Sequence, residues 1–228
     1  MNNVSMKPQN LHQMAQTLLV APKVDAANVN ALINTGGRRY FGARDMALQA
    51  PFVDAAASID PNNRANTFLS YYTYGAAVGL GLDLTIRRGF PGKSLDGFMR
   101  LMWETYGRSS VRYEVPTPYT VADLERTLGV YTEDAAFAQA FFAQYITGRE
   151  VVDYAALLAP AGFVLRPARP GAGSLGTVQL GSYDETGAQV RSAVFSSDPL
   201  YAAGLERGDR IVSVDGAMIT SAEAWQST

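Results

Sequence analysis

Three tyrosines stand close together in the segment SYYTYG, at positions 71, 72 and 74. The segment lies in the first part of the longest stretch of helical periodicity, which runs without proline from about residue 66 to residue 88. A phenol that faces a groove near a helix N-terminus can donate a hydrogen bond to a developing oxyanion. On pattern alone, however, three amphipathic tyrosines are more typical of the core and its rim.

Few other side chains could ligate a metal or take part in catalysis. Cysteine is absent and His12 is the only histidine, so the chain contains no H-E-x-x-H pair, no three-histidine site and no thiolate zinc site. Metal chemistry would need residues from elsewhere. The pairs Arg38-Arg39 and Arg87-Arg88 could bind a carboxylate or a phosphate, although such pairs are more often surface charges.

The composition of the chain excludes some classes of binding partner. The chain has 228 residues with 19 basic and 21 acidic side chains, a net charge of −2, so it lacks the basic excess that nucleic-acid binding needs. No apolar run is long enough to span a membrane, and the first 30 residues show no export signal. We therefore expect a globular protein with neither nucleic acid nor a membrane span among its partners.

Residues 1–167 carry helical periodicity and predict a mainly α-helical lobe. We expect helices at about 9–20, 25–34, 43–49, 66–88, 95–106, 121–128, 133–146 and 154–158, and an irregular stretch from 38 to 64. The expected N-caps are Asn66 or Thr67, Ser94, Thr120 in a capping box with Asp123, and Thr132.

On the helix expected at 66–88, four residues share one face. Tyr72, Gly75, Ala76 and Gly79 follow the i, i+3, i+4, i+7 spacing, which places the tyrosine above a stripe of small residues. Small side chains allow another element to approach closely.

Residues 168–228 change to short alternating runs between glycine-rich turns, typical of a small β-rich domain. We expect strands at 163–166, 177–183, 188–195 and 210–214, a further strand after Asp215-Gly216, and a one-turn helix at 199–203. Residues 1–8 show no pattern typical of a strand or of a helix cap. The pattern of residues 221–228 is typical of the start of a helix. Both ends therefore predict a fragment of a longer chain.

Four blocks, in this order, resemble a known family: NTFLSYYTYGAAVGLGLDLTIRR, KSLDGFMRLMWETYGR, YTVADLERTLG and ITGREVVDYAALLAPAGFVLR. They are similar to the C-terminal half of the catalytic region in the PDZ-containing glycyl aminopeptidases. These are zinc metallopeptidases of the thermolysin-like, gluzincin type. The resemblance covers roughly residues 9–228. Arginine makes up 16 of the 19 basic residues, which suggests a bacterial source, with the periplasm and the cytoplasm both open as the compartment.

The resemblance implies a zinc enzyme that cleaves peptide bonds near an N-terminal glycine or alanine. Tyr72 matches the tyrosine that stabilises the tetrahedral intermediate in that family, while Tyr74 replaces a usual lysine. The family's H-E-x-x-H helix and glutamate ligand would lie before residue 1. The chain alone should therefore bind no zinc and be catalytically inert.

The segment DPLYAAGLERGDRIVSVDG resembles a PDZ domain of the bacterial protease type, without its closing helix and final strand. The resemblance implies that Leu205, Ile211 and Val214 form a core. It also implies that the loop Ser174-Leu175-Gly176 holds the C-terminal carboxylate of a peptide through its backbone N–H groups. Peptide binding and a docking role without a ligand both stay open.

Two other functions fit the same residues. The chain could be a non-enzymatic PDZ-like peptide-binding module on a helical scaffold. The single histidine fits this alternative, because such a module needs no metal site. The chain could also be a degenerate peptidase retained as a partner protein.

Overall fold

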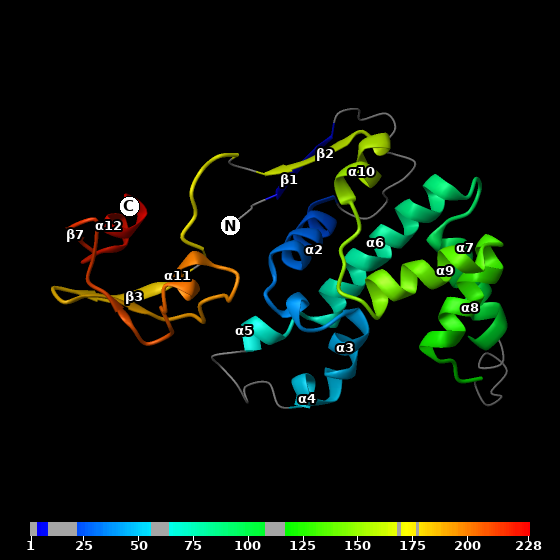
Figure 1. Ribbon diagram of the computed structural model, residues 1–228, viewed down its shortest axis with the longest axis horizontal. Coiled ribbons are helices and arrows are strands. Elements are labelled where there is room, and N and C mark those ends of the chain that lie inside the picture. The colour runs from blue at the N-terminus through cyan, green and yellow to red at the C-terminus, as the bar shows by residue number, and fades with distance from the viewer. Residues whose placement is uncertain (1–3, 9–21, 56–63, 108–116, 168–169, 177) are drawn as a thin grey trace.

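The computed structural model describes residues 4–8, 22–55, 64–107, 117–167, 170–176 and 178–228. The chain is mostly helical, with a few small antiparallel strands. Figure 1 shows α2 to α10 gathered on one side and β3, β7, α11 and α12 on the other. The expectation of a helical part followed by a small sheet region is confirmed at this level.

Among the described residues, the helical part contains nine α-helices, one of them central, and four 3-10 or π-helical segments. Its α-helices are α2 (Pro22–Asn34), α3 (Ala43–Leu48), α4 (Ala50–Ala55), α5 (Arg64–Thr67), α6 (Tyr71–Gly89), α7 (Leu95–Met102), α8 (Val121–Thr132), α9 (Ala135–Phe141) and α10 (Tyr154–Leu158). Two 3-10 turns, η1 (Gly37–Arg39) and η5 (Ala159–Ala161), and two π-helical segments, η2 (Trp103–Gly107) and η4 (Phe142–Ile146), complete it.

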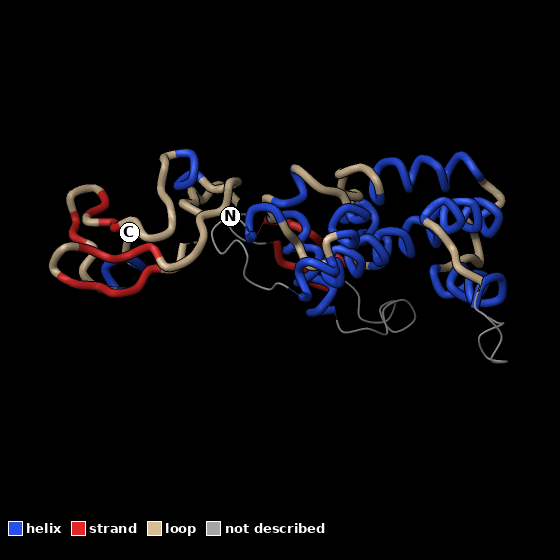
Figure 2. The backbone as a smooth tube through the Cα atoms, turned by 90° about the horizontal axis from the view of Figure 1, so that it is seen from below, coloured by secondary structure: helices blue, strands red, loops and turns tan. Residues whose placement is uncertain are grey.

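The strands form three small sheets among the described residues (Figure 2). In the first, β1 (Val4–Pro8) pairs antiparallel with β2 (Phe163–Pro167). The C-terminal part contains β3 (Leu180–Asp184), β4 (Gly187–Val190), β5 (Arg210–Ile211), β6 (Ser213–Val214), β7 (Ala217–Met218) and the helices α11 (Pro199–Ala202) and α12 (Ala222–Gln226). The order is β3-β4-β5 in one sheet and β6-β7 in the other.

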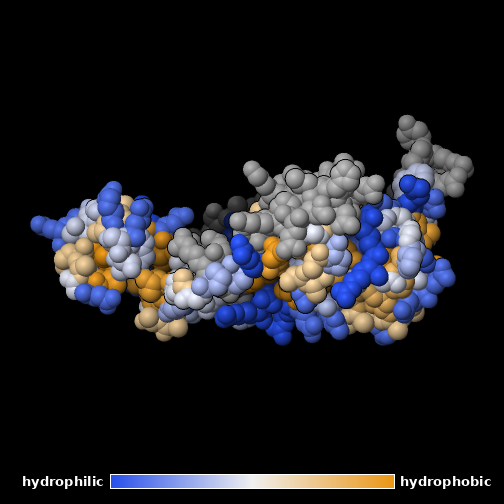
Figure 3. All heavy atoms as spheres, turned by 90° about the horizontal axis from the view of Figure 1, so that it is seen from above, coloured by the Kyte–Doolittle hydropathy of each residue, from blue (hydrophilic) through white to orange (hydrophobic). Residues whose placement is uncertain are grey.

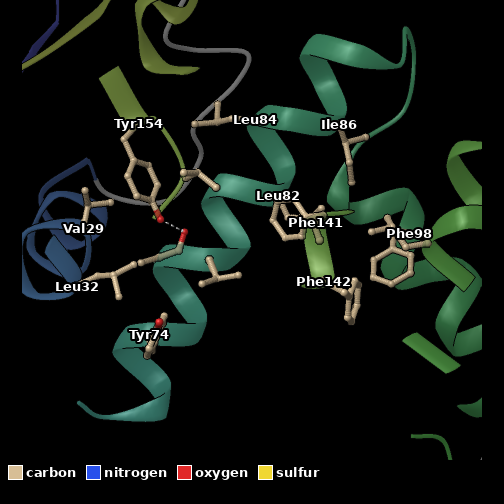
Figure 4. Close-up of a cluster of buried hydrophobic side chains, with 14 of the residues drawn as sticks. Val29, Leu32, Tyr74, Leu82, Leu84, Ile86, Phe98, Phe141, Phe142 and Tyr154 are labelled. Atoms are coloured by element: carbon tan, nitrogen blue, oxygen red, sulfur yellow. Dashed lines mark hydrogen bonds between the residues drawn. The ribbon is translucent and has the colours of Figure 1, made fainter. Parts of the chain in front are cut away.

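The helix α6 supplies much of the buried core. Its side chains at Tyr74, Ala77, Leu82 and Ile86 are buried, and α2, α3, α7 and α10 contact it. Figure 4 shows Tyr74, Leu82 and Ile86 along α6, with Val29 and Leu32 of α2 on one side and Phe98, Phe141 and Phe142 on the other. Because a Cβ at Gly81 would lie 2.7 Å from Val152, this glycine permits the close approach of the segment that leads into α10.

Two of the four predicted caps are confirmed. The Ser94 hydroxyl accepts from the Gly97 amide at 3.4 Å, and Thr120 and Asp123 form the expected capping box. Thr132, however, does not begin α9. Asp134 does, accepting from the Phe137 amide at 2.8 Å, because α8 continues to Thr132 and Glu133 then turns the backbone with φ 62°.

The predicted start of the central helix is wrong. Asn66 and Thr67 lie in α5, and α6 begins only at Tyr71, after Ser70. The reason is a tertiary contact: the buried Asn66 amide donates from Nδ2 to the Val194 carbonyl at 2.8 Å and accepts at Oδ1 from the Ser196 amide at 2.7 Å. The side chain that was expected to cap a helix instead joins the helical part to the segment after β4.

Other expectations were incomplete. The strand β1 was not predicted, because its five residues carry no pattern of their own and form a strand by pairing with β2. The irregular stretch 38–64 contains α4 and the start of α5 beside the expected α3. The strands β3 to β5 are shorter than predicted. The helix expected at 9–20, with His12, lies outside the described residues.

The two hydrogen bonds of Asn66 lead to a first prediction. Asn66→Ala leaves the Val194 carbonyl and the Ser196 amide without this partner, so we expect the free energy of unfolding to fall by about 2–4 kcal/mol. Chemical denaturation followed by circular dichroism measures the change. Gln139→Ala, an exposed amide on α9, is the control and should cost little. An Asn66→Ala variant as stable as the control would contradict the role of this contact.

The capping box of α8 leads to a second prediction. Hydrogen bonds from the Thr120 hydroxyl and amide, then from Arg126, lower the pKa of Asp123 from 3.8 to about 2. The charged carboxylate therefore stabilises the fold above pH 3.8, and this contribution is lost as the pH falls through about 2. Thr120→Ala should raise the pKa of Asp123 toward 3.8 in a carbon-13 NMR titration, and Arg126→Ala should raise it less. An unchanged pKa in Thr120→Ala would refute this cause.

Candidate functional site

The first turn of α6 separates the three tyrosines of the predicted site. Tyr72 is 76% exposed, and its ring centroid lies 4.6 Å from that of the neighbouring Tyr71. Tyr72 is thus a surface residue at the N-terminal end of a 19-residue helix. The side chain of Ser70 makes no capping hydrogen bond, so the helix end keeps its partial positive charge toward this surface.

Tyr74 occupies the opposite side of the same helix. It is fully buried, and its hydroxyl has no hydrogen-bond partner among the described residues. Burial, the main cause, raises the pKa of this phenol, against a smaller opposing effect of Arg38. In Figure 4 Tyr74 lies below Tyr154, whose hydroxyl donates to the Ala77 carbonyl at 2.7 Å. Tyr74 is therefore a core residue.

The small-residue face beside Tyr72 is open in this chain. Gly75 and Ala76 are exposed, and a Cβ built on Gly75 would meet no atom within 4 Å. Only Gly79 has a neighbour, the Leu95 side chain at 3.8 Å from such a Cβ. The opposite face, with Ala77 and Val78, is buried. The expected stripe therefore exists, and no described element covers its first two turns.

The predicted loop Ser174-Leu175-Gly176 lies at two different cavities. Gly176 adopts φ 101°, its amide donates to the Ser174 hydroxyl at 3.2 Å, and a Cβ there would collide with the Asp198 carboxylate. The backbone of the loop thus packs directly against a carboxylate from the start of α11. Ser174 faces a pocket shared with the helical part, whereas Leu175 borders an apolar groove.

That apolar groove has a volume of about 540 Å³. Leu205, Ile211 and Val214, which were predicted to form a core, are only half-buried and line it with Leu200 and Trp225. The prediction of a closed core is wrong for these residues. The buried apolar side chains among the described residues of this part are instead Ala188, Val190, Val194 and Ile219. Figure 3 shows hydrophobic atoms at the surface of the C-terminal part.

The pocket that contains Ser174 has a volume of about 250 Å³. Arg38 and Arg39 of η1 line it from the helical part, and Ser197 and Asp198 line it from the segment before α11. The sequence marked the arginine pair but favoured an ordinary surface role. The sequence gave no indication that Asp198 would lie near these arginines. Its only local feature is its place before Pro199, at the N-cap position of α11.

Four other acidic side chains cap or brace the helices. Asp123 and Asp134 cap α8 and α9, Glu133 pairs with Lys93 at 2.8 Å, and Asp83 pairs with Arg87 at 2.7 Å. Across the part of the chain that the structure describes, no three His, Cys, Asp or Glu side chains come together in a way that could hold a metal ion. These residues do not fit a zinc ion.

Comparisons with known proteins give no identification. No protein-family model and no curated protein matches this sequence. Within the described residues, no helix combines the length and the apolar character needed to cross a bilayer.

The two buried tyrosines give a matched prediction. Tyr154→Phe removes a hydrogen bond to the Ala77 carbonyl, and we expect the free energy of unfolding to fall by about 1–2 kcal/mol. Tyr74→Phe removes a buried hydroxyl that has no partner among the described residues, so stability should stay the same or rise. Urea denaturation of both variants tests the difference. Equal losses in the two variants would show that the Tyr74 hydroxyl has a partner after all.

Proposed function

We propose that this chain forms the tyrosine-bearing wall of the active site in a zinc aminopeptidase of the gluzincin type. In this proposal Tyr72 donates a hydrogen bond to the oxyanion of the tetrahedral intermediate during cleavage near an N-terminal glycine or alanine. The zinc ligands would belong to another segment of the polypeptide. The helical part would be the C-terminal lobe of a thermolysin-like catalytic domain, and the C-terminal part an incomplete PDZ-like domain.

One observation carries the proposal: the exposed Tyr72 lies on an uncovered face of small residues. A phenol that served only the core would be buried, as Tyr74 is, whereas Tyr72 is 76% exposed. The bare surface at Gly75 and Ala76 leaves room for a second wall or a substrate to reach the tyrosine hydroxyl. This arrangement fits the role that the family resemblance implies for Tyr72.

The electrostatics of α6 support the same role. The N-terminal end of a helix carries a partial positive charge, and Tyr72 stands in its first turn. A negative charge that develops near the Tyr72 hydroxyl would be stabilised by both the hydrogen bond and the helix end. The described residues do not fit a zinc ion, so this chain contributes donation and positioning only, and no step at the metal is assigned to it.

The apolar groove of the C-terminal part supports a second candidate, a PDZ-like peptide-binding module. The groove is bordered by Leu175 of the predicted carboxylate loop and by Leu205 and Ile211. An extended peptide with an apolar C-terminal side chain could use such a surface. The contact between Gly176 and Asp198 argues against free access to that loop, so this candidate ranks second.

The test of the first proposal is a single substitution in the intact gene product that contains this sequence. Tyr72→Phe should lower kcat for hydrolysis of glycine and alanine anilides about a hundredfold or more, because an oxyanion donor is lost, with little change in KM. The chain of 228 residues alone should show no hydrolysis, with or without added zinc.

Tyr119→Phe, an exposed tyrosine before α8, is the matched control and should retain full activity. A loss below about tenfold in Tyr72→Phe would argue against oxyanion stabilisation. An intact gene product that binds no zinc would overturn the peptidase assignment and favour the peptide-binding module.

A further inference from the structure

The pocket beside η1 gathers positive charge from one part of the chain and polar groups from the other. Arg38 and Arg39 lie on its helical side, and Ser174, Ser197 and Asp198 on the other side. Its volume of about 250 Å³ is small, so it suits a small ligand or the end of a longer one. The charges of the lining side chains determine which kind of ligand it would bind.

Both arginine side chains are held in place by backbone carbonyls. Arg38 donates from Nε to Leu32 at 3.3 Å and from Nη1 to Arg149 at 3.2 Å, and Arg39 donates from Nη1 to Ser196 at 3.3 Å. Arg149 in turn donates to the Arg39 carbonyl. A guanidinium has about five N–H donors, so these bonds orient the two groups and still leave donors for a ligand.

Carboxylate partners are absent where they would be expected. Among the described residues, the ion pairs involve Arg87, Lys93, Arg126 and Arg210, and neither Arg38 nor Arg39 has a carboxylate oxygen within 4.0 Å. Two adjacent, oriented guanidinium groups without a carboxylate partner attract an anion. Carbonyl oxygens satisfy some of their N–H groups but do not neutralise their charge.

Asp198 limits the charge of that anion. This aspartate is buried and lines the same pocket, with Ser197 at hydrogen-bond distance, 3.5 Å. Its negative charge offsets part of the charge of the two arginines, so the three side chains together carry about one positive charge. A singly charged carboxylate neutralises that charge, whereas a doubly charged phosphate would leave one negative charge uncompensated and would cost more to desolvate. The planar guanidinium fork also matches a carboxylate.

We propose that this pocket is a binding site for a small monocarboxylate, such as the carboxyl end of an amino acid derivative or a short peptide, held by Arg38 and Arg39. The site is distinct from the apolar groove bordered by Leu175 and from the surface at Tyr72. Because the ligand would touch η1 and the segment 196–198 together, its binding would also strengthen the contact between the helical and C-terminal parts.

The test uses this chain alone, so its outcome is independent of the aminopeptidase proposal. N-acetylglycine and N-acetylglycinamide differ only in the charged carboxylate, and each is titrated into the nitrogen-15-labelled chain by NMR. We expect N-acetylglycine to cause saturable shifts at the amides of residues 35–39 and 196–198 with a Kd on the order of 1 mM. The amide should cause none, and inorganic phosphate at pH 8 should bind more weakly.

Two variants locate the site. Arg39→Gln removes the charge of an exposed side chain and should weaken N-acetylglycine binding about tenfold, and Arg38→Gln should do the same. Arg100→Gln, an exposed arginine on α7, is the control and should bind as the unaltered chain does. Equal shifts from the acid and its amide, tighter binding of phosphate, or Arg39→Gln binding within twofold of the control would each overturn the proposal. The first two outcomes are measured on the unaltered chain, so the proposal can be refuted even if a variant fails to fold.

Discussion

The periodicity of a single helix governs what this chain can present to a ligand. Residues two apart on an α-helix point about 200° away from each other, so α6 cannot bury Tyr74 without turning Tyr72 outward. The burial of Tyr74, Ala77 and Leu82 against α2 and α10 fixes the rotation of the helix. The same packing therefore delivers an exposed phenol and a bare strip of small residues on the outer face.

A second constraint joins the two parts of the chain. Asn66 gives both ends of its side-chain amide to the backbone after β4, and Arg39 adds a hydrogen bond to the Ser196 carbonyl. These contacts are polar and directional, unlike the apolar packing around α6. They bring η1 to the segment before α11, and the pocket between Arg38 and Asp198 exists only because of that meeting.

The two proposed sites therefore differ in origin. The surface at Tyr72 follows from local helical geometry and a resemblance in sequence, and its function depends on a partner segment that would carry the metal. The arginine pocket follows from long-range contacts within this chain and needs no other segment. The apolar groove of the C-terminal part is a third feature, formed where Leu205, Ile211 and Val214 remain half-buried.

The features that depend on neighbours along the chain could be predicted before folding is considered. Helical spacing located α6, α7 and α10, hydroxyl and carboxylate caps located the starts of α7 and α8, and the i, i+3, i+4 pattern placed Tyr72 with Gly75 and Ala76. The remaining features could not be predicted, because they depend on partners that are distant in sequence. The strand β1 needed β2, Asn66 left its expected cap for Val194, and Arg38 acquired Ser174 and Asp198 as neighbours. No local pattern contains such pairings, since their free energy comes from contacts that form only when the chain has folded.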